Sequence, residues 1–459
     1  MPNPFGLSDT IVAIATPPGR GALAIVRVAG PRAHEIAGAI IERLPAEPRT
    51  AMLSSVLDAG GAELDQSLVI RYDAPASFTG EDAVEILTHG GLVVPTTVLG
   101  ALLAHGARLA QPGEFTRRAV LNGKLDILQA EATGDLVNAS SRAAQHVAVR
   151  QLDGGLSRRV LALRDELIGL EALIAYDIDF PEEDDGPIAP QRIGEAARRI
   201  EGLLERLLAT AKAGQLVREG ALVVLAGAPN VGKSSLFNAL LGESRAIVTD
   251  IPGTTRDAIE AVIDTPVLPL RLVDTAGIRD SHDPVERIGV EISASYVARA
   301  AAVLACWDDV ATLEAITQAL KGLSAGPVIA VRTKVDVTPH RDEALPELAA
   351  KFDRQIDVSA ETGEGLALLL DAVAEVVVGR AGQVEVDAPM LTQERHRFAV
   401  GRALDELRLF QEAWTMQSIP APVAAVHLRE AITTLEDLIG AVDVEQVLDE
   451  VFRRFCVGK

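Results

Sequence analysis

The feature that most constrains the fold of this chain is a glycine-rich loop between an apolar run and a helical segment. Residues 227–234 read Gly-Ala-Pro-Asn-Val-Gly-Lys-Ser and match the pattern G-x-x-x-x-G-K-[ST]. The loop follows the strand-like run 222–226 and precedes the helical segment 235–240. Such a loop turns backbone N–H groups around phosphates, and the helix N-terminus adds positive potential. The sequence therefore predicts a nucleotide site in which Lys233 reaches the terminal phosphates and Ser234 binds Mg²⁺.

An α/β domain surrounds this loop in the sequence. Between residues 219 and 380, β-branched apolar runs at 222–225, 270–273 and 328–331 alternate with helical segments. This alternation is typical of a parallel sheet with crossover helices. We therefore expect residues 219–380 to form a Ras-like P-loop G domain with a doubly wound, mostly parallel sheet.

Two other kinds of pattern flank this domain. Residues 1–124 mix short apolar runs with Gly/Pro turns, which predicts an α+β domain. Residues 125–218 and 381–459 carry apolar positions at helical spacing, interrupted by a loop at 179–187, and predict long helices. A multidomain protein is expected, because a chain of 459 residues has room for roughly three domains. The α/β domain is predicted to be inserted into a discontinuous helical domain.

Composition excludes several classes of protein. Apolar runs stay below the roughly 18 to 20 residues of a membrane span, and the first residues do not resemble a secretion signal. Cys306 and Cys456 form neither a disulfide framework nor a metal motif. We expect a cytoplasmic protein without membrane association. The net charge of −22 argues that any RNA contact is local or shared with a partner.

Two downstream motifs favour GTP over ATP. Residues 249–257 follow the loop by about one helix, where a switch segment would offer a Thr hydroxyl to Mg²⁺ and the γ-phosphate. Residues 274–277 read Asp-Thr-Ala-Gly and follow the strand run 270–273. Asp274 can hold the metal through water there, and the Gly277 N–H can sense the γ-phosphate. Their order along the chain predicts a GTPase.

Guanine recognition is expected after the third strand run. The sequence there is Thr333-Lys-Val-Asp336, in which Thr333 stands where Asn is usual for such elements. Asp336 can accept hydrogen bonds from the guanine N1–H and amine, and Lys334 can cover the ring. Ser359 and Ala360 fit the last base-contacting loop. Guanine is therefore favoured, while the shorter Thr333 leaves its affinity open.

Hydrolysis needs a group that orients water, and the usual Gln is absent. Ile278 follows the Asp-Thr-Ala-Gly motif and cannot perform this role. The nearby acids are Asp280, Asp283 and Glu286, and their spacing alone does not choose among them.

With these motifs the chain resembles the tRNA-modification GTPase family MnmE, also called TrmE, over nearly its whole length. The resemblance extends to residues 10–21, to Ser-Phe-Thr-Gly-Glu-Asp at 77–82, to Pro-Gly-Glu-Phe-Thr at 112–116 and to Phe-Cys-Val-Gly-Lys at 455–459. It implies an N-terminal folate-binding domain that forms a homodimer, and a partner, MnmG, that contains FAD. It also implies that the two proteins add a carboxymethylaminomethyl or aminomethyl group to C5 of the wobble uridine of certain tRNAs.

The same resemblance assigns roles to individual residues. It implies a K⁺-stimulated reaction, Glu286 as the acid that orients the attacking water, and Cys456 as a functional thiol. The one-carbon unit would come from a tetrahydrofolate derivative, 5-formyl- or methylene-tetrahydrofolate. Mg²⁺ is assigned to Ser234 and Thr255, K⁺ to Asn230, Thr249, Ile251 and Thr254, and the folate to Arg27, Glu85, Lys124 and Lys459.

The motifs and the resemblance together give a set of GTP-binding residues. They are Asn230, Val231, Gly232, Lys233, Ser234, Ser235, Thr249, Asp250, Ile251, Pro252, Gly253, Thr254, Thr255, Asp274, Thr275, Ala276, Gly277, Thr333, Lys334, Val335, Asp336, Ser359, Ala360 and Glu361.

Two alternatives share the same phosphate loop. One is a ribosome-assembly GTPase similar to the Era and Der groups, which usually carry an RNA-binding module after the G domain. The other is an ATP-using P-loop enzyme, which Asp336 and the switch segment disfavour. Folate binding by residues 1–124 would separate the first of these from the modification enzyme.

Overall fold

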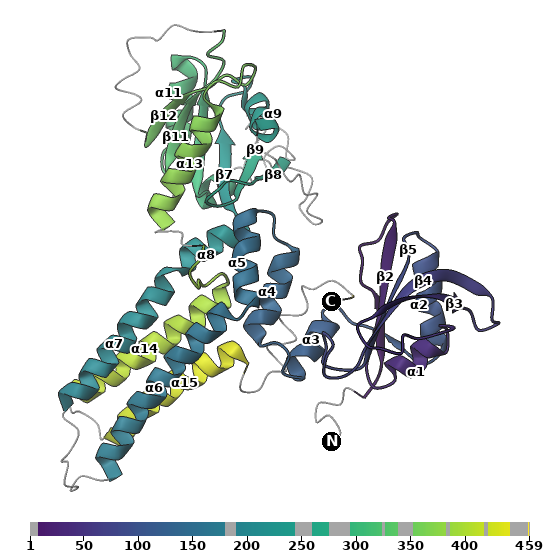
Figure 1. Ribbon diagram of the computed structural model, residues 1–459. Coiled ribbons are helices and arrows are strands. Elements are labelled where there is room, and N and C mark those ends of the chain that lie inside the picture. The colour runs from purple at the N-terminus through teal and green to yellow at the C-terminus, as the bar shows by residue number, and fades with distance from the viewer. Residues whose placement is uncertain are drawn as a thin grey trace, which may run out of the picture. The chain divides into compact units, whose positions relative to one another are not determined.

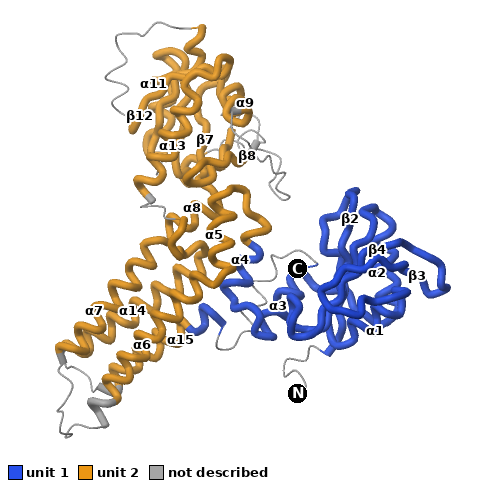
Figure 2. The backbone as a smooth tube through the Cα atoms, in the orientation of Figure 1, with its two compact units in different colours: residues 1–134, 436–459 blue, residues 135–435 orange. Residues whose placement is uncertain are grey.

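A computed structural model describes residues 8–179, 190–243, 259–274, 294–323, 326–337, 352–381, 386–416, 421–440 and 458. The chain forms two compact units, one of residues 1–134 with 436–459 and one of residues 135–435 (Figure 2). Within the described ranges, no helix combines the length and the apolar character needed to cross a bilayer.

The first unit is built on a six-stranded sheet (Figure 1). Its strands are β1 (Ile11–Ile14), β2 (Leu23–Ala29), β3 (Ala51–Leu57), β4 (Glu63–Tyr72), β5 (Ala83–His89) and β6 (Arg108–Leu109). They lie in the order β3-β4-β5-β2-β1-β6, and all neighbours are antiparallel except β1 and β6. The unit also contains helices α1 (Ala33–Gly38), α2 (Val94–Ala104) and α3 (Glu114–Leu121), and α4 (Ile127–Val137) leads out of it.

The two faces of this sheet differ in what covers them. On one face, strand residues such as Val26 and Ile86 pack with Ile36 of α1 and Leu102 of α2 in a buried apolar core. On the other face, Phe115 of α3 packs with small residues of β1, β2 and β5. Alternation along each strand therefore divides the sheet between a closed core and a face that is only partly covered.

A buried ionic network holds α3 against the sheet. Arg118 is fully buried, and its guanidinium donates to Asp9 Oδ1 at 2.7 Å, to Glu114 Oε1 at 3.0 Å and to Glu81 Oε1 at 3.2 Å. Burial alone would raise the pKa of Glu114, but hydrogen bonds from Arg108, the Gln111 N–H and Arg118 hold that pKa below its usual value. The stabilisation from ionised Glu114 is therefore present at neutral pH and is lost as the pH falls through the folded-state pKa.

The second unit contains a helical part and a second sheet. Its helices outside the sheet region are α5 (Arg142–Leu152), α6 (Gly155–Asp179), α7 (Pro190–Ala209), α8 (Ala211–Glu219), α14 (Glu394–Met416) and α15 (Ala421–Ile439). Four of them, α6, α7, α14 and α15, run alongside one another (Figure 1). Helices that precede the second sheet in sequence thus pack with helices that follow it.

Ion pairs join the four helices around the outside of this bundle. Arg199 of α7 pairs with Glu166 of α6, and Arg408 of α14 reaches Glu201 of α7 at 2.8 Å. Arg429 of α15 reaches Glu171 of α6 at 2.6 Å. Inside, Leu167, Leu204, Phe410 and Leu435 are among the fully buried residues that supply most of the stabilisation, because exposed ion pairs contribute little. 

The second sheet is mostly parallel. Its strands are β7 (Ala221–Ala226), β8 (Ile259–Ile263), β9 (Leu270–Asp274), β10 (Ala302–Trp307), β11 (Val328–Arg332) and β12 (Arg354–Asp357). They lie in the order β12-β11-β10-β7-β9-β8, and only β8 is antiparallel to its neighbour. Helices α9 (Lys233–Glu243) and α13 (Leu366–Ala381) contribute to one core and α11 (Val310–Ala319) to the other, so both faces are covered.

The expected fold classes agree with these elements. The 1–124 segment is α+β, the 219–380 segment is an α/β sheet covered on both faces, and the flanking segments are helical. The loop expected at 179–187 and the helical pattern expected beyond residue 440 lie almost wholly outside the described residues.

Replacing Arg118 by Leu should destabilise the first unit. The change leaves the mostly buried Glu81 without its cation and removes one of the two cations on Glu114, which keeps Arg108; a broken buried ion pair typically costs about 3–5 kcal/mol. Pulse proteolysis of the full chain in increasing urea, scored on cleavage within residues 8–134, measures the loss. Arg32→Ala removes an exposed pair with Glu35 and serves as the control, which should leave the midpoint unchanged. An equal midpoint for Arg118→Leu would contradict the role of the network.

Candidate functional site

The phosphate loop joins β7 to α9 with little room for side chains. A Cβ atom on Gly227 would lie 2.4 Å from the carbonyl oxygen of Cys306 on the neighbouring strand, so only glycine fits. Gly232 has φ of +94° and Asn230 has φ of 65°, a region that L residues other than Asn and Asp rarely adopt. The sequence pattern is therefore explained by backbone geometry at the end of β7.

Lys233 is held inside this loop. Its Nζ donates to the carbonyl oxygens of Gly227 at 2.9 Å and of Ala228 at 2.8 Å. Burial lowers the pKa of Lys233, although the neighbouring Asp274 carboxylate opposes that shift. A buried ammonium surrounded by carbonyl oxygens is stabilised when an anion approaches. The loop can therefore receive a phosphate group at this position.

Ser234 and Asp274 meet beside the loop, as the motifs predict. Ser234 Oγ donates to Asp274 Oδ2 at 2.8 Å across the ends of β7 and β9. The carboxylate is nearly fully buried, and its second oxygen, Oδ1, has no hydrogen-bond partner among the residues that the structure describes. A hydroxyl and a buried carboxylate oxygen are hard oxygen donors of the kind that Mg²⁺ prefers. These two residues fit a magnesium site.

A pocket of about 380 Å³ lies next to the phosphate loop. It collects Thr333, Lys334, Asp336 and Ala360, which were expected to bind the base, and its lining comes from three separate parts of the sequence. The lining residues are Gly232, Ser235, Leu236, Thr333, Lys334, Asp336, Val337, Val358, Ala360 and Glu361. Leu236, Val337 and Val358 belong to no motif and could not be assigned from the sequence. The volume and the Asp336 carboxylate suit a purine base.

Two side chains connect this pocket to the phosphate loop. The Thr333 hydroxyl donates to the carbonyl oxygen of Val231 and lies 3.1 Å from that of Trp307. Lys334 Nζ donates to the carbonyl oxygen of Asn230 at 2.6 Å and pairs with Asp308 at 2.7 Å. Thr333 therefore hydrogen-bonds to the loop although it is shorter than the Asn usual there, and its effect on guanine affinity stays a prediction. Asp308 was not foreseen from the sequence.

The other predicted base-loop residues hold the backbone. The Val335 N–H donates to the carbonyl oxygen of Val358 at 3.4 Å. Ser359 is buried, and its hydroxyl accepts from the Thr362 N–H at 3.2 Å. Neither lines the pocket, so their effect on a base would come through the positions of Asp336 and Ala360.

Several predicted residues lie outside the described part of the chain. They are Thr249, Asp250, Ile251, Pro252, Gly253, Thr254, Thr255, Thr275, Ala276, Gly277, Glu286, Cys456 and Lys459. Of the four residues assigned to K⁺, Asn230 alone falls within the described ranges.

A second pocket, of about 110 Å³, opens on the partly covered face of the first sheet. Arg27 and Glu85 occupy facing positions of β2 and β5, and Arg27 Nη2 lies 2.7 Å from Glu85 Oε1. The Tyr72 hydroxyl donates to Glu85 Oε2 at 3.1 Å. Burial and the nearby Glu85 carboxylate raise the pKa of Tyr72, which keeps the phenol protonated as a donor. Two of the residues assigned to the folate therefore meet in one pocket.

Aromatic rings and the segment 73–82, which connects β4 to β5, complete this pocket. The Arg27 guanidinium lies 5.7 Å from the ring centre of Phe78 and 5.6 Å from that of Phe115. Ser77, Phe78 and Thr79 line the pocket. Lys124 does not line it, but its Nζ donates to the carbonyl oxygen of Pro75 at 3.1 Å, in the same connecting segment. Tyr72 was missed from the sequence because only strand register places it beside Glu85.

Cys306 is a core residue. It is fully buried on β10, and burial raises the pKa of its thiol to about 12. The thiol therefore stays protonated near neutral pH.

Comparison with known proteins gives consistent matches along the chain. The family profile for the MnmE helical domain matches residues 127–456, and that for the N-terminus of the GTP-binding protein TrmE matches residues 10–124. The tRNA modification GTPase MnmE of Azoarcus sp. is 42% identical over 98% of each chain. That of Heliobacterium modesticaldum is 41% identical over 99% of this chain and 100% of its own.

A solved structure also aligns with part of the chain. The G domain of the T. maritima FeoB iron transporter is 30% identical and covers 34% of this chain and 98% of its own, with a TM-score of 0.28.

Thr333→Val should weaken binding of a guanine nucleotide. The change removes a hydroxyl donor and leaves the buried carbonyl oxygen of Val231 without its bond, at a cost of about 1–3 kcal/mol, or roughly five- to 150-fold in affinity. Fluorescence titration with a labelled GDP measures the dissociation constant. Thr317→Val is a matched control, because its hydroxyl bonds to the Leu313 carbonyl oxygen within α11, away from the phosphate loop. Wild-type affinity in Thr333→Val would show that the contact with the loop is dispensable.

Proposed function

This chain belongs to the tRNA modification GTPase MnmE family, and from that premise we propose a K⁺-stimulated GTPase that serves modification of the tRNA wobble uridine. The observation that carries the GTPase part is the junction of Lys233, the Ser234–Asp274 pair and the 380 Å³ pocket at one end of the second sheet. The family match and the helical segments on both sides of this sheet disfavour a ribosome-assembly GTPase of the Era or Der type.

GTP binding follows from the three parts of this site. The base would enter the pocket beside Asp336, whose carboxylate can accept from the N1–H and the exocyclic amine of guanine. The phosphates would lie along residues 227–234, where Lys233 compensates their charge. Mg²⁺ would be held by Ser234 and Thr255, with Asp274 acting through water, and it would neutralise charge on the phosphates.

The hydrolytic step is assigned to residues around the phosphate loop. Ile278 cannot orient the attacking water, and we assign this role to Glu286 from the resemblance to the MnmE family. Asn230, Thr249, Ile251 and Thr254 would hold K⁺, which can neutralise transition-state charge where other GTPases use an arginine. The position of Asn230 in the phosphate loop, with φ of 65°, supports this assignment.

Glu286→Ala should reduce GTP hydrolysis by about a hundredfold or more while sparing GTP binding, because a general base or water-orienting group typically contributes roughly 10²–10⁴-fold. Replacing K⁺ by Na⁺ should slow the wild-type protein. Phosphate release measures the rate of hydrolysis and a GDP titration measures nucleotide affinity. Both are measured in K⁺ and in Na⁺, so that a loss of hydrolysis is distinguished from a loss of binding. Asp280→Ala is the control and should hydrolyse GTP at the wild-type rate. Full turnover by Glu286→Ala would remove its role, and equal rates in both salts would remove the K⁺ site.

The first unit is proposed to bind a tetrahydrofolate derivative, 5-formyl- or methylene-tetrahydrofolate. A pterin ring carries donors that the Glu85 carboxylate can accept, and Arg27 suits its carbonyl oxygen. Phe78 lies open enough, at 42% exposure, to stack on a flat ring. Lys124 and Lys459 are assigned to anionic parts of the cofactor, and Cys456 to a functional thiol near it. 

The same sheet face supports the proposed homodimer. Leu53, Leu68, Leu87 and Ile25 face one another in register across β3, β4, β5 and β2. Leu53 is 64% exposed and Leu68 40% exposed, so this apolar stripe is open to a second copy of the unit. We propose a folate-binding and dimerisation domain at 1–124, helical segments at 125–218 and 381–459, and a G domain at 219–380.

The chemistry on tRNA is proposed to be shared. An FAD-dependent protein similar to MnmG would be the partner, and the two would add a carboxymethylaminomethyl or aminomethyl group to C5 of the wobble uridine in the cytoplasm. The one-carbon unit would come from the folate in the first unit. The net charge of −22 supports a complex in which much of the tRNA is held by the partner.

Cells that lack this chain should lose the modified wobble uridine. Mass analysis of tRNA nucleosides measures the loss, and other modified nucleosides in the same digest are the internal control. Re-expression of the wild type should restore the modification, whereas Lys233→Ala should not, because it lacks the phosphate-binding cation. Lys212→Ala, which removes an exposed contact with the Arg380 carbonyl oxygen, is the matched control. Intact modification in cells without the chain would overturn the proposal.

A further inference from the structure

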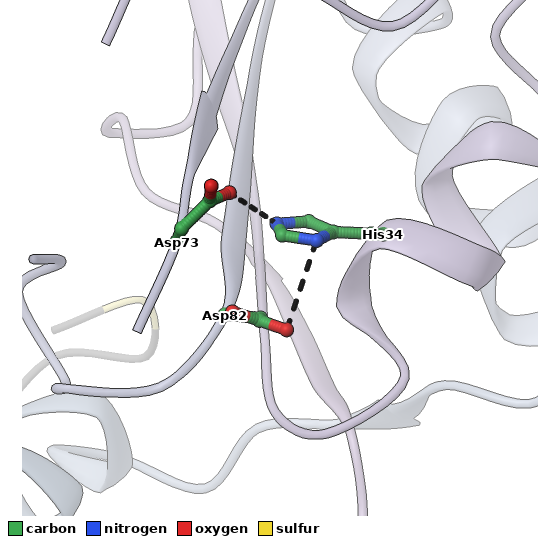
Figure 3. A group of neighbouring side chains, drawn as sticks. All are labelled: His34, Asp73 and Asp82. Carbon is green, nitrogen blue, oxygen red and sulfur yellow. Dashed lines mark ion pairs between the residues drawn. The ribbon is translucent and has the colours of Figure 1, made fainter. Parts of the chain in front are cut away.

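A histidine outside the pocket joins the two ends of the segment that lines it. His34 lies on α1, and Asp73 and Asp82 are the first and last residues of the connection 73–82 between β4 and β5 (Figure 3). His34 Nε2 is 3.7 Å from Asp73 Oδ1, and His34 Nδ1 is 3.7 Å from Asp82 Oδ2. The imidazole ring therefore lies between the two carboxylates.

Hydrogen bonds fix the orientation of this ring. Nε2 lies 2.9 Å from the Tyr72 carbonyl oxygen, which can only accept, so Nε2 carries a proton. Nδ1 then faces Asp82, and a protonated ring pairs with both carboxylates. The main-chain hydrogen bond holds whether or not Nδ1 is protonated.

The arrangement is that of a clamp and differs from a shared metal site. The two carboxylates approach opposite nitrogens of the ring, as Figure 3 shows, whereas ligands of one ion converge on a common point. Asp73 is also neutralised by Arg71, whose Nε lies 3.0 Å from Oδ1. Asp82 Oδ1 accepts from the Ala74 N–H at 2.9 Å, which joins the two ends of the connection directly.

The middle of this connection forms the wall of the folate-like pocket. Ser77, Phe78 and Thr79 line the pocket opposite the Arg27–Glu85 pair. The carbonyl oxygen of Thr79 accepts from Asn122 Nδ2 at 2.7 Å, and that of Ala76 accepts from Arg49 Nη2 at 2.9 Å. The bonds from Asn122 and Arg49 hold the middle of the segment 73–82, while His34 contacts the residues at both of its ends.

We propose that His34 is a positioning residue that sets the shape of the 73–82 wall and thereby the affinity of the pocket for a pterin-type cofactor. The cofactor part rests on the function proposed above, whereas the clamp itself does not. His34 touches no residue named for catalysis, so its loss should leave GTP hydrolysis unchanged. Losing the bond to the Tyr72 carbonyl oxygen and the contacts with both carboxylates should loosen the wall and weaken the binding of a flat ring against Phe78.

The test compares His34→Ala with the wild type in the full chain by two measurements. Hydrogen exchange of the amides in residues 73–82 should become at least several-fold faster in His34→Ala, while exchange in β7 stays the same. Calorimetric titration with 5-formyltetrahydrofolate should show about tenfold weaker binding, the scale expected for one lost hydrogen bond. The GTPase rate should remain within twofold of the wild type.

Two further variants control this comparison. His89→Ala removes another His–Asp pair of the same sheet, 2.6 Å from Asp65, and should change neither exchange in 73–82 nor folate affinity. His34→Gln keeps an N–H donor for the Tyr72 carbonyl oxygen but carries no charge, so it should restore part of the protection. A His34→Ala protein that lost its fold would show fast exchange throughout residues 8–134, and His34→Gln would then decide the outcome.

Each result has a distinct meaning. Unchanged exchange in 73–82 overturns the clamp whatever the ligand does. Fast exchange with unchanged folate affinity overturns the link between the clamp and the pocket. A wild type that binds no 5-formyltetrahydrofolate, with exchange still dependent on His34, overturns the folate assignment and supports the clamp. If EDTA alone reproduces the His34→Ala exchange in the wild type, the cluster binds a metal ion and the clamp is overturned.

Discussion

The nucleotide site depends on the hydrogen bonds by which Thr333 and Lys334 reach the carbonyl oxygens of Val231 and Asn230. These bonds join the base pocket to the phosphate loop, although about a hundred residues separate them in sequence. Asp308 fixes Lys334 from the adjacent strand end, so three strands of the parallel sheet contribute to one cradle. Because these bonds hold the base pocket and the phosphate loop together before a nucleotide binds, less conformational entropy is lost from the protein on binding.

The sequence predicted the site best where the functional residues are consecutive along the chain. The phosphate loop, the Asp274 motif and the Asp336 element each consist of a few consecutive residues at a strand end, and a parallel sheet brings strand ends together. The alternation of apolar runs and helical segments predicted that sheet correctly. The long-range contacts could not be predicted, because the closeness of Gly227 to the Cys306 carbonyl oxygen and the reach of Thr333 depend on strand register and on packing.

The first unit shows the opposite balance. Its α+β class was predicted from short apolar runs and turns. No motif marks Arg27 and Glu85 in the sequence, and they were assigned from the family resemblance. Their pairing arises from the register of β2 and β5, and Tyr72 joins them through the register of β4 and β5. Antiparallel sheets place chemistry by cross-strand neighbours that are distant in sequence, whereas the P-loop places it by neighbours along the chain. The role of His34 could not be predicted either, because its contacts with Asp73 and Asp82 arise only from the packing of α1 against the sheet.

The burial of Cys306 has a consequence for studying this protein in solution. The chain has two thiols, and the pKa of about 12 and complete burial of Cys306 remove one of them from reaction in the folded state. Any thiol alkylation or thiol oxidation that the folded protein shows must therefore come from Cys456, three residues from the chain end. A simple thiol titration of the native protein thus reports on the C-terminal tail alone, without any engineered label.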